Sequence, residues 1–205
     1  MTLNISQIHM ATAVSNETLD LLFRKARTQY CWTERRVPDA LLRTIWDLCC
    51  LGSTSANTSP MRVVFIISQE AKARLKPLVL PANVEKCMKA PVVALFGYDM
   101  RFYDRLPQLF PHTDARSWFV GNHDLITETA FRNGTLQAAY FMMAARAMGL
   151  DCGAISGFDL GGADRTFFAD SHVKSNFLCN FGYGSGDKVF PRSPRLKFED
   201  GCQIL

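Results

Sequence analysis

The sequence predicts a single α+β domain, in which a small mixed or mainly antiparallel sheet is flanked by helices. Three observations support this fold class: two helical patterns precede the first strand, the strands are few, and helices separate them. A chain of 205 residues with 48% hydrophobic content can build one full core. We therefore expect one domain over residues 1–205, with an N-terminal arm at 1–15 and a polar C-terminal arm at 187–205.

Two amphipathic helices are expected before the first strand. Ser15 offers an N-cap, and apolar residues at helical spacing extend the first helix to about Arg27. The second helix opens at residues 38–39, a proline followed by aspartate, and ends at Gly52 in a C-cap position. The eight residues 53–60 that follow carry hydroxyl and amide groups without one charge.

The remaining elements alternate between buried strands and helices. β-branched and aromatic residues predict strands at 63–67, 91–96 and 176–181. Apolar periodicity predicts helices at 70–76, 126–148 and 164–168. Residues 101–121 mix aromatic rings, prolines and arginines without a period, and a stretch of this length predicts a lid-like functional loop.

Composition argues against several classes of protein. The formal charge of +4 is spread over short basic clusters, so a nucleic-acid partner is not expected. The chain has no basic stretch followed by an apolar run and no segment of membrane-crossing length, which favours a cytoplasmic protein without membrane contact. Seven cysteines without C-x-x-C spacing are typical of reduced core thiols.

The sequence also lacks the motifs of other common enzyme classes. Its four histidines are scattered, so no metal site is predicted, and neither a G-x-S-x-G elbow nor a Walker loop occurs. The glycine-rich stretch at 182–186 follows a strand but precedes no helix, and it therefore predicts a turn instead of a dinucleotide site. The remaining polar loops and separated arginines suit a ligand that combines a flat heteroaromatic edge with a phosphate.

The order of four motifs along the chain resembles the nitroreductase family. These motifs are Arg27-Thr28, STSANTSPMR at 53–62, GLDCGAISGFD at 149–159 and PRL at 194–196, and the resemblance spans roughly residues 24 to 200. Three further strings resemble the branch that contains malonic semialdehyde reductase and NADH dehydrogenase/NAD(P)H nitroreductases. They are RLPQLFPHTDARSWF at 105–119, ETAFRNGTLQAAY at 128–140 and KSNFLCNFGYG at 174–184.

The resemblance implies a three-layer, FMN-dependent homodimer with two active sites at the subunit interface and NAD(P)H as the electron donor. Arg27 and Thr28 would contact the phosphate and ribityl side of FMN, and Arg195 would bind the phosphate. Asn57 would contact the flavin ring, whereas Ser55 would approach it from the partner chain.

A backbone segment completes the implied cofactor site. Ile155, Ser156 and Gly157 would present their main chain to the ring near the reactive N5 atom. The resemblance implies two successive hydride transfers through N5, from NAD(P)H and then to the acceptor, which should give ping-pong kinetics. Because FMN supplies the chemistry, no obligatory catalytic side chain is predicted.

Three positions depart from the family pattern. Tyr30 and Ser193 stand where many relatives have basic residues, so phosphate neutralisation must come from elsewhere, with Arg192 and Arg24 the nearest substitutes in sequence. Ser53 replaces a common proline at the start of the polar loop.

Several functions remain open at this point. The acceptor could be a nitroaromatic, a quinone or a short oxo-acid, and the branch suggests reduction of malonic semialdehyde to 3-hydroxypropionate in pyrimidine degradation. An acid substrate needs a cation, for which Arg105 and Arg116 in the 101–121 segment are the candidates. A flavin-holding protein without turnover and, last, a metal-dependent hydrolase are the alternatives.

Overall fold

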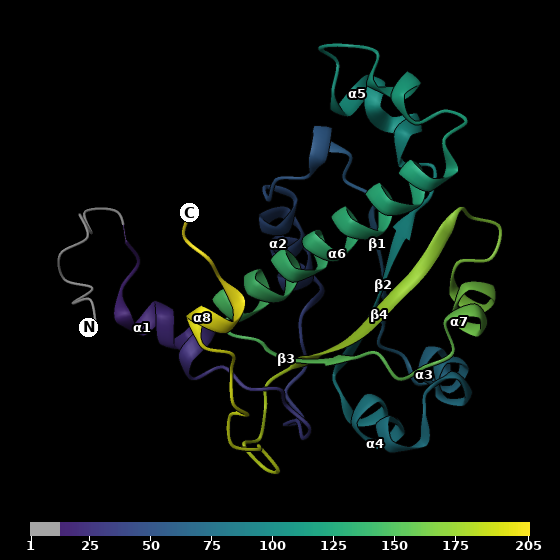
Figure 1. Cartoon of the computed structure of the whole chain (residues 1–205). Helices are drawn as coiled ribbons and strands as arrows, with labels where there is room; N and C mark the ends of the chain where they lie inside the picture. Colours follow the sequence, from purple (N-terminus) through teal and green to yellow (C-terminus); the bar gives the residue numbers. More distant parts are fainter. Residues whose placement is uncertain (1–12) are drawn as a thin grey trace.

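The computed structural model describes residues 13–205, and its centre is a four-stranded antiparallel sheet in the order β1-β2-β4-β3 (Figure 1). The strands are β1 Met61–Ile66, β2 Val92–Asp99, β3 Asp151–Ile155 and β4 Val173–Gly182. Every neighbouring pair is antiparallel, so the expected α+β class is confirmed and the sheet is not mixed. Strand β3 forms one edge of this sheet.

Helices cover both faces of the sheet and produce three layers. On one face lie α2 (Asp39–Cys50) and α6 (His123–Ala147), and on the other lie α3 (Gln69–Leu75), α4 (Pro81–Lys89) and α7 (Leu160–Phe167). Successive side chains of a strand point to opposite faces, so Phe96 packs in the core under α2 and α6 while Leu95 packs in the second core.

The 25-residue helix α6 runs the length of the sheet, about 38 Å at 1.5 Å per residue. Its N-cap, Asn122, accepts a hydrogen bond from the backbone N–H of Leu125. Close packing against the sheet depends on Gly134, because a Cβ there would lie 2.8 Å from the Cβ of Tyr98. Small residues therefore allow the helix to approach the sheet directly.

The predicted elements are largely present, with shifted ends. The first helix is α1 (Asn16–Leu19) continued by a π-helical turn, Asp20–Arg24, and it ends before Arg27. Within the three layers, α4 and β3 were not predicted. Helix α4 has only nine residues and few of them are buried, while β3 is five residues long and contains Gly153.

The segment 101–121 is more regular than the sequence indicated. It holds three four-residue helical turns, Phe102–Arg105, α5 Leu106–Leu109 and Ala115–Trp118. Phe102, Leu106 and Phe119 pack with the first turns of α6 in a small core of their own. No period was visible because each turn is too short to repeat one, and the expectation of an irregular loop is corrected accordingly.

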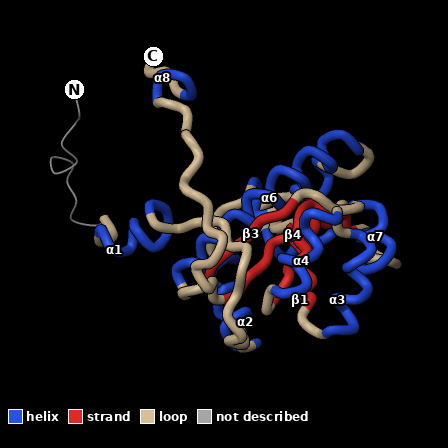
Figure 2. Tube along the Cα trace, turned by 90° about the horizontal axis from the view of Figure 1, so that it is seen from below, coloured by secondary structure: helices blue, strands red, loops and turns tan. Residues whose placement is uncertain are grey.

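Helix α1 and the C-terminal arm extend from the same side of the sheet (Figure 2). The C-terminal arm carries one further short helix, α8 (Phe198–Gly201). Of the expected N-terminal arm at 1–15, residues 1–12 lie outside the described part. Among residues 13–205, no helix is both long enough and apolar enough to cross a membrane.

Candidate functional site

Four arginines from distant parts of the chain share one pocket of about 360 Å³. Arg27 follows the first helix, Arg146 lies in the last turn of α6, and Arg192 and Arg195 belong to the C-terminal arm. Within residues 13–205 no carboxylate lines this pocket; the other lining residues are Phe23, Ala26, Thr28, Tyr30, Phe190, Pro191 and Ser193.

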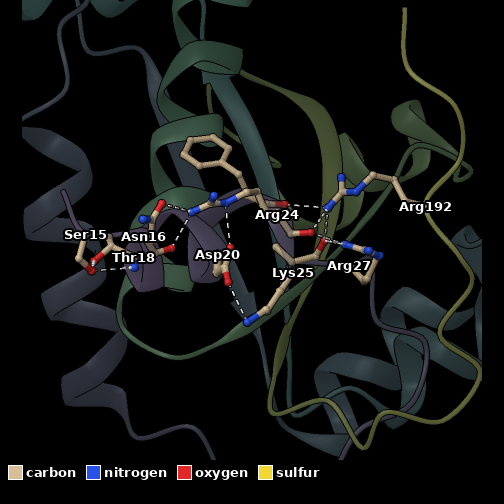
Figure 3. A network of polar contacts seen from close by, with 10 residues as sticks. Ser15, Asn16, Thr18, Asp20, Arg24, Lys25, Arg27 and Arg192 are labelled. Carbon is tan, nitrogen blue, oxygen red and sulfur yellow. Dashed lines mark hydrogen bonds and ion pairs between the residues drawn. The ribbon is translucent and has the colours of Figure 1, made fainter. Parts of the chain in front are cut away.

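Neutral carbonyl groups hold these arginines in place. Arg192 donates from one nitrogen to the carbonyl oxygens of Phe23, Arg24 and Ala26 at 2.7, 2.9 and 3.1 Å. Arg27 donates to two of the same carbonyls, those of Arg24 and Ala26, at 3.0 and 2.9 Å (Figure 3). These bonds fix the guanidinium groups without neutralising them.

The nearby carboxylate of Asp20 does not reach the pocket. It pairs with Arg24 at 2.8 Å and with Lys25 at 2.7 Å, outside the pocket wall (Figure 3). Arg24, one of the two substitutes predicted for phosphate neutralisation, is therefore engaged elsewhere, whereas Arg192 is a wall residue. Of the two residues predicted as substitutes, Arg192 therefore lines the pocket and Arg24 does not.

The four positively charged guanidinium groups of the pocket repel one another. Partial desolvation, followed by the charges of Arg27, Arg195 and Arg146, lowers the pKa of Arg192 from its usual value. Arginine still stays protonated near neutral pH, so the four charges persist. An anion placed among them would relieve this repulsion and could accept charge-assisted hydrogen bonds from several guanidinium groups.

Arg146 was missed in the sequence because its position has an ordinary explanation. A cation in the last turn of a helix complements the helix dipole, and most such residues do no more. Here one nitrogen donates to the carbonyl of Leu22 at 3.1 Å, which turns the half-buried side chain toward the pocket.

Two of the three positions that depart from the family pattern, Tyr30 and Ser193, lie in the pocket wall. Tyr30 packs edge-on against Phe190 with ring centroids 5.4 Å apart, and the ammonium of Lys86 lies 5.0 Å from its centroid. The carbonyl of Ser193 accepts a hydrogen bond from Arg195 at 2.8 Å. Both positions thus shape the wall without adding a cation of their own.

The edge strand β3 connects the arginine pocket to the predicted backbone segment. Thr28 forms a bridge with Cys152, and the N–H of Gln29 donates to the Cys152 carbonyl at 3.1 Å. Ile155 is three residues further along the strand, about 10 Å away. Arg27, Thr28 and Arg195 therefore lie near one end of this strand and Ile155, Ser156 and Gly157 at its other end.

The backbone at this far end is held by hydrogen bonds from Leu80 and Asn83. The carbonyl of Gly157 accepts hydrogen bonds from the N–H of Leu80 at 3.1 Å and from the amide of Asn83 at 3.2 Å. A Cβ at Gly157 would lie 2.5 Å from the Asn83 amide nitrogen, so any larger residue would displace the Asn83 side chain from its hydrogen bond. Ser156 beside it is exposed.

The polar loop 53–60 lies elsewhere on the same chain. The N–H of Ser55 donates to Asn133 on α6, which is 13 residues, or about 20 Å, along the helix from Arg146. The side-chain amide of Asn57 donates to the Leu109 carbonyl at 2.8 Å. Ser55 and Asn57 are both exposed, and neither lines the arginine pocket of its own chain.

The two arginines predicted to hold an acid substrate have different surroundings. Arg116 donates to the carboxylate of Asp104 at 3.1 Å, and Arg101 pairs with the same carboxylate at 2.6 Å. Arg105 is exposed and forms no ion pair within residues 13–205. Neither Arg105 nor Arg116 lines the arginine pocket.

Comparisons with known proteins agree on one family. The Nitroreductase family profile matches residues 23–183. “Putative NADH dehydrogenase/NAD(P)H nitroreductase HadB” of Ralstonia pickettii is 56% identical over 190 residues, which is 91% of this chain and 97% of that protein. A Rhodopseudomonas palustris protein of the same descriptive name is 52% identical over 196 residues, covering 96% and 100% of the two chains.

Solved structures share the fold at low sequence identity. A nitroreductase structure from Exiguobacterium sibiricum, determined in complex with FMN, superposes with a TM-score of 0.82 at 21% identity and covers 94% of this chain and 99% of its own. An NAD(P)H:FMN oxidoreductase structure from Staphylococcus epidermidis gives a TM-score of 0.82 at 18% identity, covering 93% and 97%. With the profile matched over residues 23–183 and relatives above 50% identity, this chain belongs to the nitroreductase family.

Proposed function

We propose that this protein is an FMN-dependent NAD(P)H oxidoreductase whose arginine pocket binds the phosphate of FMN. The observation that supports this most directly is the group of four arginines without a lining carboxylate in the described chain, at the start of edge strand β3. Relatives whose names include NAD(P)H nitroreductase and a structural neighbour in complex with FMN point to the same cofactor and donor.

The residues present fit a phosphate monoester. Its charge would balance guanidinium groups that now repel one another, and Arg195, Arg192, Arg146 and Arg27 offer forks that suit phosphate oxygens. The hydroxyl of Thr28 is a further donor in the same wall. The expected phosphate residues Arg27, Thr28 and Arg195 thus gain two partners, Arg146 and Arg192.

The ring would lie along β3, toward Ile155, Ser156 and Gly157. Since the Gly157 carbonyl is held from behind by Leu80 and Asn83, the segment offers a fixed backbone surface to a flat ligand. Bound FMN would supply the hydride chemistry, and the chain's own residues would bind the phosphate, orient the ring and exclude water.

Ser55 and Asn57 would serve the flavin of a partner subunit in a homodimer. The supporting observation is their distance from the arginine pocket of their own chain, together with their exposure. Helices α2 and α6 also expose apolar side chains that a second copy could cover, among them Leu48 and Leu136, and Leu51 is exposed directly after α2. Sedimentation analysis should therefore give the mass of a dimer, and a monomer that binds FMN with full affinity would contradict this arrangement.

The test of the cofactor is direct. Purified protein, or protein reconstituted with FMN, should be yellow, and NADH or NADPH should bleach the flavin absorption under anaerobic conditions. Reoxidation by malonic semialdehyde, a quinone and a nitroarene in parallel then identifies the acceptor class. A protein that cannot be reconstituted with FMN contradicts the proposal, and one that is reduced but transfers to no acceptor favours the flavin-holding alternative.

A short oxo-acid acceptor would need a cation to bind its carboxylate. Arg105 is a better candidate for this cation than Arg116. Arg116 already shares Asp104 with Arg101, so its charge is compensated, whereas Arg105 has no ion-pair partner in the described chain. Arg105→Ala should then raise KM for the oxo-acid and leave nitroarene turnover unchanged. Equal effects on both acceptors would argue against carboxylate binding at this position.

A further inference from the structure

The polar loop 53–60 adopts a backbone conformation that its residues do not favour by themselves. Ala56, Asn57 and Ser59 have positive φ angles of 46°, 51° and 40°, and none of them is glycine. Asparagine tolerates this region of φ, but alanine and serine rarely adopt it, so the surrounding structure must hold Ala56 and Ser59 there. Part of this support is internal, because the hydroxyl of Thr54 accepts a hydrogen bond from the N–H of Ser59 at 3.2 Å.

The external support comes from two buried amides on α6. Asn133 is 3% exposed and its side-chain oxygen accepts a hydrogen bond from the N–H of Ser55 at 2.8 Å. Gln137 is 2% exposed and accepts one from the N–H of Met61 at 2.9 Å. Residues four apart project from the same face of a helix, so the pair fixes the loop near both of its ends.

The orientation of the Asn133 amide is itself determined. Its nitrogen donates to the carbonyl of Thr129 one turn earlier at 2.9 Å, which leaves the oxygen facing Ser55. A leucine would fill a similar volume but could not accept the bond, and the N–H of Ser55 would lose its partner.

We propose that Asn133 is a positioning residue, which holds the polar loop so that Ser55 and Asn57 meet the flavin of the partner subunit. This inference rests on the proposed function, because the loop needs a fixed shape only if it contacts the cofactor. Asn133 touches neither cofactor nor substrate and acts through the backbone of Ser55. A loop fixed before binding loses less freedom when it meets the ligand, which favours affinity.

The experiment compares two substitutions that differ at one acceptor. Asn133→Leu and Asn133→Asp both remove the donor to Thr129, but only aspartate keeps an oxygen for the Ser55 N–H. In the dimer without FMN, amide hydrogen exchange of residues 53–61 should accelerate about fivefold or more in Asn133→Leu, the factor expected for one neutral hydrogen bond. Asn133→Asp should restore the protection.

Flavin binding provides the second readout. The dissociation constant for FMN should rise about fivefold in Asn133→Leu and return toward wild type in Asn133→Asp. The matched control is Val93→Ala, which truncates a buried side chain of β2 in the core on the sheet face opposite α6 and lowers stability without touching the loop. If Asn133→Leu does not fold, Asn133→Ala replaces it in the same comparison.

The outcomes separate the two levels of the proposal. If wild type binds FMN and Asn133→Leu behaves like Val93→Ala in both exchange and affinity, the positioning role is overturned while the proposed function stands. If wild type cannot be reconstituted with FMN, both are overturned. Selective loss at the loop with rescue by aspartate supports the positioning role.

Discussion

The arginine pocket and the polar loop 53–60 are two candidate cofactor-binding regions that the fold stabilises in opposite ways. In the pocket, like charges from distant parts of the chain are held by neutral carbonyls, and no carboxylate among the described residues lines the pocket. In the loop, strained backbone is fixed by neutral hydrogen bonds to buried amides of α6. We expect a bound phosphate to stabilise the first region, whereas the second is already formed, and substitutions should separate the two.

The largest effect is expected at Arg192. Arg192→Met removes one pocket charge and also the bonds to the carbonyls of Phe23, Arg24 and Ala26 that attach the C-terminal arm. The dissociation constant for FMN should rise about 30-fold, in the range for charge-assisted hydrogen bonds, while riboflavin binding should change little. Titration by flavin fluorescence measures both constants.

A neighbouring arginine outside the pocket provides the control for this substitution. Arg24→Met removes an equal charge, but Arg24 binds Asn16 and Asp20 and does not line the pocket. It should change FMN affinity by less than about twofold, as expected for an exposed pair. An Arg24→Met effect as large as that of Arg192→Met would mean that general charge, not the pocket, governs binding.

Arg146 should give an intermediate effect, because it contributes charge without holding the arm. Arg146→Met leaves the Arg192 bonds in place and loses one donor to the Leu22 carbonyl. We expect FMN affinity to fall about tenfold with riboflavin affinity unchanged. Unchanged FMN affinity in this variant would remove Arg146 from the phosphate site while leaving the other three arginines.

The preformed loop can be disturbed without altering any charge. Ala56→Val places a β-branched side chain at φ 46° and ψ 31°, a region that such residues avoid. The free energy of unfolding should fall by about 1 kcal/mol. Ala40→Val at an exposed position of α2 serves as the control and should cost about half as much from helix propensity. Equal costs in urea titrations would show that the loop stores no strain.

The sequence predicted elements whose pattern repeats over several turns or that a motif marks. Helix α6 was found because its apolar residues recur over 25 positions. Arg27, Thr28 and Arg195 were chosen from motifs, and the fold brings them to one pocket although the last is far along the chain. The short strand β3 was missed, because five residues with a central glycine do not establish a period.

Other parts of the site depend on tertiary contacts that no local pattern contains. Arg146 resembles any helix-ending cation until the fold places it beside Arg192, and Arg24 resembles a pocket residue until Asp20 engages it. The buried amides Asn133 and Gln137 were part of a helical stretch, and their acceptor roles appear only when the loop lies against α6. The sequence therefore predicts candidate residues, and the tertiary packing determines which of them line the pocket or hold the loop.

Ionic strength should distinguish the two regions in the wild-type protein itself, with the smallest effect of this series. Salt screens exposed charges beyond about 10 Å at 0.1 M. A higher salt concentration should therefore weaken phosphate binding to the partly exposed arginines. We expect the FMN dissociation constant to increase about threefold at 0.5 M, which is less than either pocket-arginine substitution should produce, and to rise less in Arg192→Met. Hydrogen exchange in residues 53–61 should not respond, because neutral bonds from Asn133 and Gln137 hold the loop. An FMN affinity that is independent of salt would contradict phosphate binding by the arginine pocket and leave the preformed loop as the main determinant.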